Sequence, residues 1–400
     1  MKAGWESKKL GEVCSFLSRG ISPKYLEAGG ICVLNQKCIR DHEVNFALAR
    51  RHDISAKRVS PDRLVQAGDV LINSTGTGTL GRVAQLREAP GEPTTVDSHV
   101  TIARPLPGKF FSDFFGYMLI FIEEAIKEAG EGCGGQTELA RSVLAEKFSV
   151  AYPTSQSEQY RIVALLDEAF DGIATARANA EKNLQNARAL FESHLQSVFT
   201  ERGEVWELKT LAEIATTFGR GKSRHRPRNA PHLYGGEYPF VQTGDIRNAD
   251  HVITEYSQTY SEAGFAQSKL WPKGTVCITI AANIAETAVL GFDACFPDSV
   301  IGVVANPMQA DVHFIEYLLQ SFKSRIQAMG KGSAQANINL GTFENERFPF
   351  PSVAMQRQLV ATLDVLRDET QRLESLYQRK LAALDELKQS LLHQAFSGQL

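Results

Sequence analysis

Residues 352–396, SVAMQRQLVATLDVLRDETQRLESLYQRKLAALDELKQSLLHQAF, carry apolar side chains at alternating intervals of four and three. This heptad spacing is typical of a helix that packs along a second helix. At 1.5 Å per residue such a helix is roughly 65 Å long, more than one small domain can cover. It therefore needs a partner helix. Its a and d positions are Leu359, Leu363, Leu366, Thr370, Leu373, Tyr377, Lys380, Leu384, Leu387 and Leu391.

A second stretch in the same register lies about 197 residues earlier and supplies the partner. One stripe is rich in Ala and the other in Leu, which suits close packing of small against large side chains. Two unrelated amphipathic helices are the alternative, but the shared register at one offset favours a pair. The earlier heptad positions are Ile162, Leu166, Ala169, Ile173, Ala176, Ala180, Asn183, Ala187, Leu190 and His194.

Each helix follows one copy of a repeated unit. Trp5-Glu6-x-Lys8-x-Leu10-x-Glu12 recurs as Trp206-Glu207-x-Lys209-x-Leu211-x-Glu213, and Arg19-Gly20 recurs as Arg220-Gly221. A period of about 200 residues is a whole domain with its helix rather than a solenoid repeat. Weaker matches join residues 33–40 to 240–247, 68–72 to 274–278, Asp97-Ser98 to Asp298-Ser299, and Tyr117 to Tyr317.

We therefore predict an α+β protein with two mixed α/β domains, related by pseudo-twofold symmetry and joined by two long antiparallel coiled-coil helices. The short link after the first helix favours the antiparallel direction, which gives both domains equivalent surroundings. The expected boundaries are 1–153 for the first domain, 154–200 for the first helix, 201–351 for the second domain and 352–400 for the second helix.

Composition narrows the class of protein. The chain has 400 residues, 43% of them hydrophobic, and a formal net charge of -3. That length allows two hydrophobic cores. The mildly acidic net charge does not exclude nucleic-acid binding, because local basic patches rather than the total charge contact phosphates. The six cysteines lack metal-binding spacing, which favours a reducing compartment and no structural metal. With no signal peptide or unbroken apolar span in view, we expect a soluble cytoplasmic protein.

Catalytic motifs are scarce. Gly76-x-Gly78-x-x-Gly81 fits a nucleotide-binding pattern, which requires a helix to begin at this loop. A helix there would meet Ala89-Pro90-Gly91 within two turns, and the second copy of the repeat lacks the glycines. No G-x-S-x-G, H-E-x-x-H or Walker sequence is present, and the histidines form no ligand-spaced set. A binding protein is favoured over an enzyme.

The combination of motifs resembles the specificity subunits of type I restriction-modification systems over essentially the whole chain. The residues that carry the resemblance are Trp5–Gly20 and Trp206–Gly221, Gly68–Asn73, Gln159–Asp167 and Gln356–Asp364, and His393–Gly398. The resemblance implies a non-catalytic subunit whose two domains each read half of a bipartite site in double-stranded DNA. It also implies that the helices set the spacer and dock two methyltransferase subunits, with restriction subunits as further partners. S-adenosylmethionine and ATP would be bound by those partners, and no cofactor by this chain.

The same resemblance places DNA contacts in loops. The stretch 219–229 holds five Lys or Arg and no acidic residue, and Arg offers bidentate geometry to guanine and phosphate. A solvated charge run is the alternative there, and a hairpin turn without contacts is the alternative for the polar loop at 73–79. The candidate DNA-binding residues are Arg19, Lys24, Tyr25, Asn73, Ser74, Thr75, Thr77, Arg220, Lys222, Arg224, Arg226, Arg228 and Asn283.

Two other functions remain open. One is an enzyme with an unrecognised nucleotide site at Gly76–Gly81, and the other is a structural coiled-coil scaffold that does not bind DNA.

Overall fold

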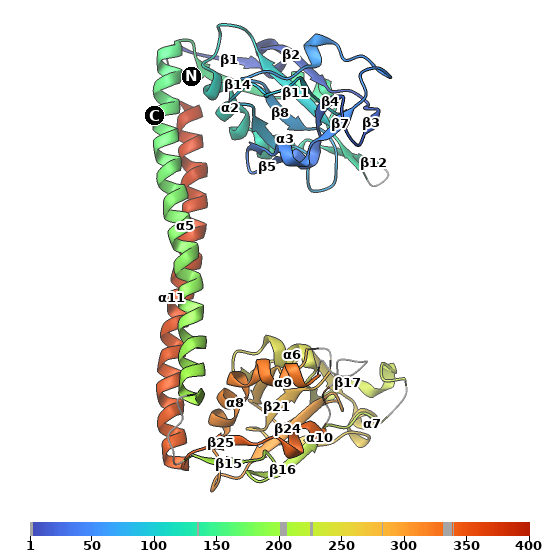
Figure 1. The fold of residues 1–400 in the computed structure, drawn as a ribbon, viewed down its shortest axis with the longest axis vertical. Coiled ribbons are helices and arrows are strands. Elements are labelled where there is room, and N and C mark those ends of the chain that lie inside the picture. The colour runs from blue at the N-terminus through green and yellow to red at the C-terminus, as the bar shows by residue number, and fades with distance from the viewer. Residues whose placement is uncertain are drawn as a thin grey trace. The chain divides into compact units, whose positions relative to one another are not determined.

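The computed structural model describes residues 3–133, 136–200, 206–224, 227–281, 283–330, 338 and 340–400. The chain divides into two compact units, each with a globular part and a segment of both long helices (Figure 1). Unit 1 comprises Met1–Ala180 and Arg379–Leu400, and unit 2 comprises Glu181–Gln378. Among the described residues, no helix is both long enough and apolar enough to cross a membrane.

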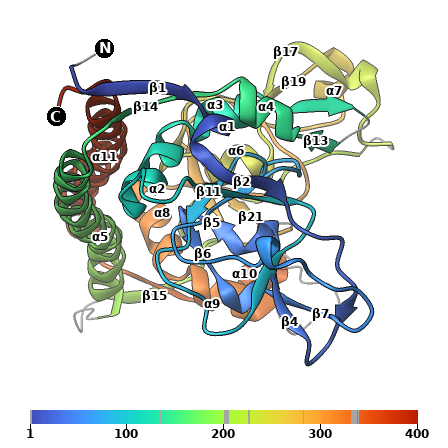
Figure 2. The same ribbon diagram turned by 90° about the horizontal axis from the view of Figure 1, so that it is seen from above.

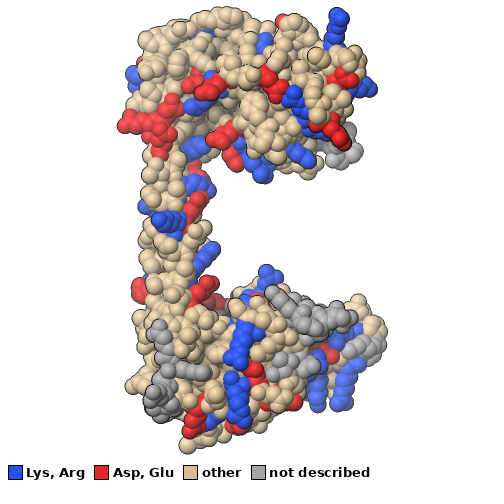
Figure 3. Space-filling view, viewed as in Figure 1, with Lys and Arg blue, Asp and Glu red and all other residues tan. Residues whose placement is uncertain are grey.

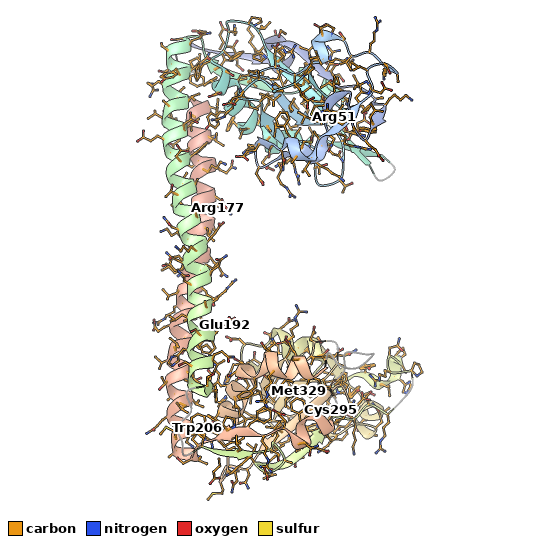
Figure 4. The ribbon with its side chains drawn as sticks, in the orientation of Figure 1. Arg51, Arg177, Glu192, Trp206, Cys295 and Met329 are labelled. Carbon is orange, nitrogen blue, oxygen red and sulfur yellow. The ribbon has the colours of Figure 1, made fainter. Side chains whose placement is uncertain are left out.

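The long helices are α5 (Gln156–Thr200) and α11 (Val353–Ser397), each of 45 residues. In unit 1, Arg161 donates to the carbonyl of Leu400 at 3.0 Å, whereas Arg177, further along α5, pairs with Asp385, which lies earlier in α11. Figure 4 labels Arg177 on this helix pair. In unit 2, Arg188 Nε lies 2.8 Å from Glu374 Oε2. The predicted antiparallel pair is confirmed.

The predicted heptad register holds for the first part of α5 and fails for the last part. Ile162, Leu166 and Ala180 are buried, but Asn183 and His194 are exposed and Leu190 is 51% exposed. The contact stripe continues instead through Leu184, Ala187, Phe191 and Leu195. A straight helix with 3.6 residues per turn drifts against a strict 3.5-residue repeat, so the stripe moves by one position.

The same drift appears in α11. Lys380 is exposed, and Leu373 and Leu387 remain 38% and 46% exposed, although all three occupy predicted a or d positions. Leu381 is half-buried in place of its neighbour Lys380. The sequence pattern therefore identified the helices correctly but misassigned part of their contact faces.

Ala180→Leu should lower the free energy of unfolding of unit 1 by roughly 1–3 kcal/mol, because overpacking forces neighbouring side chains to move. Ala180 is only 1% exposed. Ala178→Leu is the matched control, since Ala178 is exposed on the same helix and Ala and Leu have similar helix propensity. Calorimetry of the two variants measures the difference. Equal melting of Ala180→Leu and the wild type would contradict the assigned contact face.

Unit 1 contains two four-stranded sheets. The first, in the order β2-β11-β8-β9, is antiparallel, and the second has the order β10-β4-β7-β3. Strand β4 pairs in parallel with β10 and antiparallel with β7. The strands are β2 (Cys14–Arg19), β3 (Tyr25–Leu26), β4 (Ile31–Leu34), β7 (Arg50–His52), β8 (Val70–Asn73), β9 (Val83–Gln85), β10 (Thr94–Val96) and β11 (Val100–Pro105).

Shorter elements complete unit 1. Strands β1 (Trp5–Lys9) and β14 (Ser149–Pro153) form an antiparallel pair beside the ends of the long helices (Figure 2). The other strands are β5 (Ile39–Arg40), β6 (Glu43–Val44), β12 (Glu131–Cys133) and β13 (Gln136–Glu138). The helices are α1 (Leu10–Val13), α2 (Ser112–Phe121), α3 (Glu123–Glu128) and α4 (Arg141–Glu146).

Unit 2 repeats this plan. Its sheets have the orders β16-β24-β21-β22-β18 and β19-β17-β23-β20, and β15 (Glu207–Lys209) pairs with β25 (Phe348–Phe350). The sheet strands are β16 (Ala215–Arg220), β17 (Tyr234–Phe240), β18 (Val252–Ile253), β19 (Gln258–Tyr260), β20 (Leu270–Trp271), β21 (Val276–Thr279), β22 (Thr287–Leu290), β23 (Ala294–Cys295) and β24 (Val300–Ala305). The helices are α6 (Thr243–Asn248), α7 (Glu262–Ala266), α8 (Val312–Ser321), α9 (Lys323–Gly330) and α10 (Leu340–Asn345).

In each unit one apolar helix joins the sheets to the long helices. Phe114 of α2 belongs to a core that includes Leu166 of α5 and Phe396 of α11. In unit 2, Phe314 of α8 shares a core with residues of both long helices, including Phe199 and Leu363. Burial of these large side chains fixes each globular part to its segment of the helix pair.

Several repeated residues of the sequence serve this attachment. Gln159 is fully buried, and it accepts a bond from the Phe111 amide at 2.7 Å and donates to the carbonyl of Pro153 at 2.8 Å. Gln356 accepts from the amide of Asp311 and donates to the carbonyl of Pro351, both at 2.8 Å. The repeated glutamines therefore anchor the start of each long helix, since buried amides require such partners.

One predicted match between the repeats is wrong by one residue. The amide of Val100 donates to Asp97, but the corresponding amide of Val300 donates to Pro297 rather than to Asp298. Likewise the carbonyls of His99 and Ser299 accept equivalent bonds, from Ser74 and Ile280. The structural partner of Asp97 is therefore Pro297, and Asp298 belongs one residue later in the turn.

Candidate nucleic-acid interface

The polar stretch of unit 1 begins with Asn73, the last residue of strand β8, and continues with Ser74. Asn73 and Ser74 are fully buried. Asn73 Nδ2 donates to the carbonyl of Gln36 at 3.0 Å, and Ser74 Oγ lies 2.5 Å from Thr101 Oγ1. These two side chains stabilise their own turn. In contrast to the prediction, they are not placed to contact DNA.

The tip of this loop is open to solvent. Thr77 is exposed, and Thr75 Oγ1 lies 2.7 Å from Nδ1 of His99, which is also exposed. Gln36 Oε1 lies 3.4 Å from the same Thr75 oxygen. Thr75 and Thr77 thus share a polar surface with His99 and Gln36, two residues that the sequence analysis did not select.

The Gly76–Gly81 pattern is a hairpin turn. Strand β9, which pairs antiparallel with β8, follows it in the position where a nucleotide-binding fold would begin a helix. Gly76, Gly78 and Gly81 have positive φ angles, and a Cβ at Gly81 would lie 2.8 Å from the backbone of Lys127. The glycines are explained by turn geometry and close packing, which leaves the nucleotide-site alternative without structural support.

The Arg19 side chain is held by the protein itself. Its Nη1 lies 2.7 Å from Glu138 Oε1, and Nη2 donates to the carbonyl of Leu139 at 2.8 Å. Arg19 therefore ties the end of β2 to the segment after β13. Its guanidinium already has partners that a phosphate would have to displace.

Lys24 and Tyr25 lie on the exposed edge of the second sheet. Tyr25 is 40% exposed, and the Arg50 guanidinium lies 3.5 Å from the centre of its ring. Partial burial raises the pKa of the Tyr25 hydroxyl, so the ring stays neutral near neutral pH. Stacking of this kind holds the planar guanidinium in one orientation. Arg50 was not among the predicted site residues.

In unit 2 two predicted arginines bond the same residue, Asp298, one at its carboxylate and the other at its main-chain carbonyl. Arg228 Nη2 lies 2.7 and 2.8 Å from the two carboxylate oxygens of Asp298, and Arg220 Nε donates to the Asp298 carbonyl at 2.6 Å. Lys222 and Arg224 are exposed, and Arg226 lies outside the described residues. Asp298, which precedes β24, therefore supplies part of the counter-charge of the basic loop.

An open pocket of about 720 Å³ lies beside this loop. Its polar lining includes Ser223, Arg228, Gln242, Gln258 and Ser299, with Tyr234 and Phe240 as aromatic members. Gln242 Nε2 donates to Gln258 Oε1 at 3.0 Å. Asn283 lies elsewhere, in the turn between β21 and β22, where its carbonyl accepts a bond from the Thr279 hydroxyl. The structure thus brings Arg220 and Arg228 together but not Asn283.

Charge is mixed over both units. Figure 3 shows Lys and Arg interspersed with Asp and Glu on the visible face of each unit. Within the described ranges, no cluster of three or more His, Cys, Asp or Glu could hold a metal ion. Cys14, Cys32, Cys38, Cys277 and Cys295 are free thiols, and burial raises the pKa of Cys14 to about 12.

Comparison with known proteins shows which proteins this chain is similar to. Residues 203–381 match the family model for the type I restriction modification DNA specificity domain. The putative type I restriction enzyme MjaX specificity subunit of Methanocaldococcus jannaschii is 20% identical over 416 residues, covering 99% of this chain and 93% of that protein. Over nearly its whole length the chain is similar to a type I specificity subunit, and residues 203–381 match the DNA specificity domain of that family.

Solved structures share the fold of this chain. A chain from a structure on complex assembly and conformational transition of the type I R-M system has a TM-score of 0.82 at 18% identity, covering 100% of this chain and 99% of that chain. The HsdS subunit from Thermoanaerobacter tengcongensis has a TM-score of 0.64 at 19% identity, with coverage of 100% and 98%. The predicted fold class is confirmed.

Two further residues that sequence reasoning missed, Arg50 and Gln258, lie on strands rather than in motifs. Arg50 is on β7 next to Arg51, which Figure 4 labels, and Gln258 is on β19. Neither residue belongs to a basic run or a glycine-rich turn. Only the strand pairing shows that they lie beside the predicted loops.

Proposed function

We propose that this specificity subunit recognises a bipartite site in double-stranded DNA, with unit 1 reading one half and unit 2 the other. One observation carries the proposal: the same scaffold is built twice, whereas the side chains next to the loops differ between the copies. Repeated strands and anchoring glutamines keep the frame constant, and variable polar loops on such a frame suit recognition of two different sequences.

The chain would act without doing chemistry itself. Methyltransferase subunits, two in number, would dock on the long helices, which keep apolar side chains exposed on each unit's segment, among them Leu190, Leu376 and Leu387. Those subunits would bind S-adenosylmethionine, and restriction subunits would bind ATP, so that this chain needs no cofactor. Such a complex would work in the cytoplasm, where the DNA is.

The proposal is tested by selecting bound duplexes from a random DNA pool with the full chain assembled with its methyltransferase subunit. We expect two enriched blocks of sequence separated by a spacer of constant length and no fixed composition. Selection by the methyltransferase subunit alone is the control and should enrich neither block. A single block, or no enrichment by the complex, would contradict bipartite reading.

A further inference from the structure

Strand pairing places two different polar side chains at one position of the repeated scaffold. In unit 1, Val33 of β4 lies between Thr95 of β10 and Arg50 of β7. In unit 2, Phe240 of β17 lies between Cys295 of β23 and Gln258 of β19. Both central strands pair in parallel on one side and antiparallel on the other. Arg50 and Gln258 therefore occupy corresponding positions.

An independent contact fixes this alignment. A Cβ at Gly20 would lie 1.9 Å from the Val96 carbonyl oxygen, and one at Gly221 would lie 2.2 Å from the Phe296 carbonyl oxygen. Val96 and Phe296 are thus equivalent, and so are the residues before them, Thr95 and Cys295. The equivalence of Arg50 and Gln258 then follows from the ladders without any sequence similarity around them.

Arg50 is exposed and oriented by its neighbours. Its guanidinium lies over the Tyr25 ring at 3.5 Å, near the buried carboxyl of Asp97, whose pKa is raised by burial and lowered in part by Arg50. The guanidinium of the next residue, Arg51, is instead held by the protein, since it donates to Glu92 at 2.6 Å and to the carbonyls of Gly29 and Gly30. Arg50 is the arginine of β7 that remains accessible to a ligand.

Gln258 is also oriented. Its Oε1 accepts from Gln242 Nε2 at 3.0 Å, and the pair lines the open pocket of unit 2. The carbonyl oxygen of an amide has a second lone pair, and Gln258 Nε2 has no hydrogen-bond partner among the described residues. The amide can therefore still accept and donate one bond each along a common edge.

These two side chains match two different bases. Arg pairs in bidentate fashion with O6 and N7 of guanine in the major groove, and Gln pairs with N6 and N7 of adenine. We propose that Arg50 and Gln258 are the corresponding base-reading residues of the two units, with Arg50 selecting guanine in one half-site and Gln258 selecting adenine in the other. This inference rests on the proposed function, because it assigns residues to the two readers.

Exchange of the two residue types tests the inference. In the complex with the methyltransferase subunit, Arg50→Gln should change one guanine preference to adenine in one half-site, and Gln258→Arg should make the reverse change in the other. The preference at that position should shift by roughly 5- to 150-fold, the discrimination that one bidentate pair provides. Competition binding with duplexes varied at each position of the wild-type site measures the shift.

The other half-site is the internal control, since its unchanged preference shows that each variant is folded and assembled. Arg58→Gln, at an exposed arginine of unit 1, should leave base preference unchanged. If Arg50→Gln weakened binding to all duplexes equally and changed no base preference, Arg50 would contact phosphate. That result would overturn this inference but not the proposed function. A wild-type complex that showed no preference for a bipartite site would instead overturn the proposed function.

Discussion

Gly221→Ala should lower the free energy of unfolding of unit 2 by roughly 3 kcal/mol, the upper part of the range for overpacking. The added Cβ would lie 2.2 Å from the carbonyl oxygen of Phe296 and 2.5 Å from that of Pro297. These are backbone atoms of the turn before β24, and they cannot move away as a flexible side chain can. The Gly221 amide also donates to the carbonyl of Val300 at 2.9 Å, which fixes the strand end in place.

Gly219→Ala is a closely matched control, because Gly219 precedes Gly221 by two positions and a Cβ there would meet nothing within 4 Å. Hydrogen exchange resolves the units: amides of β21 should lose protection in Gly221→Ala, while those of β8 in unit 1 should not. Equal protection of β21 in Gly221→Ala and Gly219→Ala would contradict the packing argument. Gly20 has the same surroundings in unit 1, which explains why the glycine of the Arg-Gly pair recurs.

Under the proposed function, a chimera that exchanges residues 206–350 for the matching domain of a type I specificity subunit should replace one half-site and keep the other. Unit 1 and both long helices are unchanged, so the first half-site and the spacer should persist. Methylome sequencing of cells carrying the chimera and its methyltransferase subunit reports both halves of the motif. The expected effect is complete replacement of one half rather than a graded loss.

The donor domain must preserve the attachment to the helices. Phe314 of α8 contacts Phe199 of α5, with ring centres 5.4 Å apart, and Phe350 at 5.8 Å. A donor with an aromatic residue at the position of Phe314 keeps this core, whereas a donor with a small residue there is a control for misfolding. A folded chimera that altered both half-sites, or neither, would contradict separate reading by the two units.

The sequence by itself determined the repeat, the two long helices and the mixed α/β class. Heptad spacing and duplicated motifs are local sequence patterns. They can be recognised in both copies because both copies pack in the same way. The repeated Gln159 and Gln356, and the Arg-Gly pairs, mark places where buried amides or close backbones tolerate few residues. Such constraints leave a readable pattern even where the rest of the two copies has diverged.

The tertiary structure alone decided which polar side chains are free to meet a ligand. Asn73 and Ser74 look like loop residues in the sequence but are buried where β8 ends beside β11, and Arg19 is held by Glu138, far along the chain. Arg50 and Gln258 carry no motif, and their equivalence depends on strand ladders between distant segments. Burial and strand register are set by residues remote in sequence, so neither could be deduced from the local pattern around these side chains.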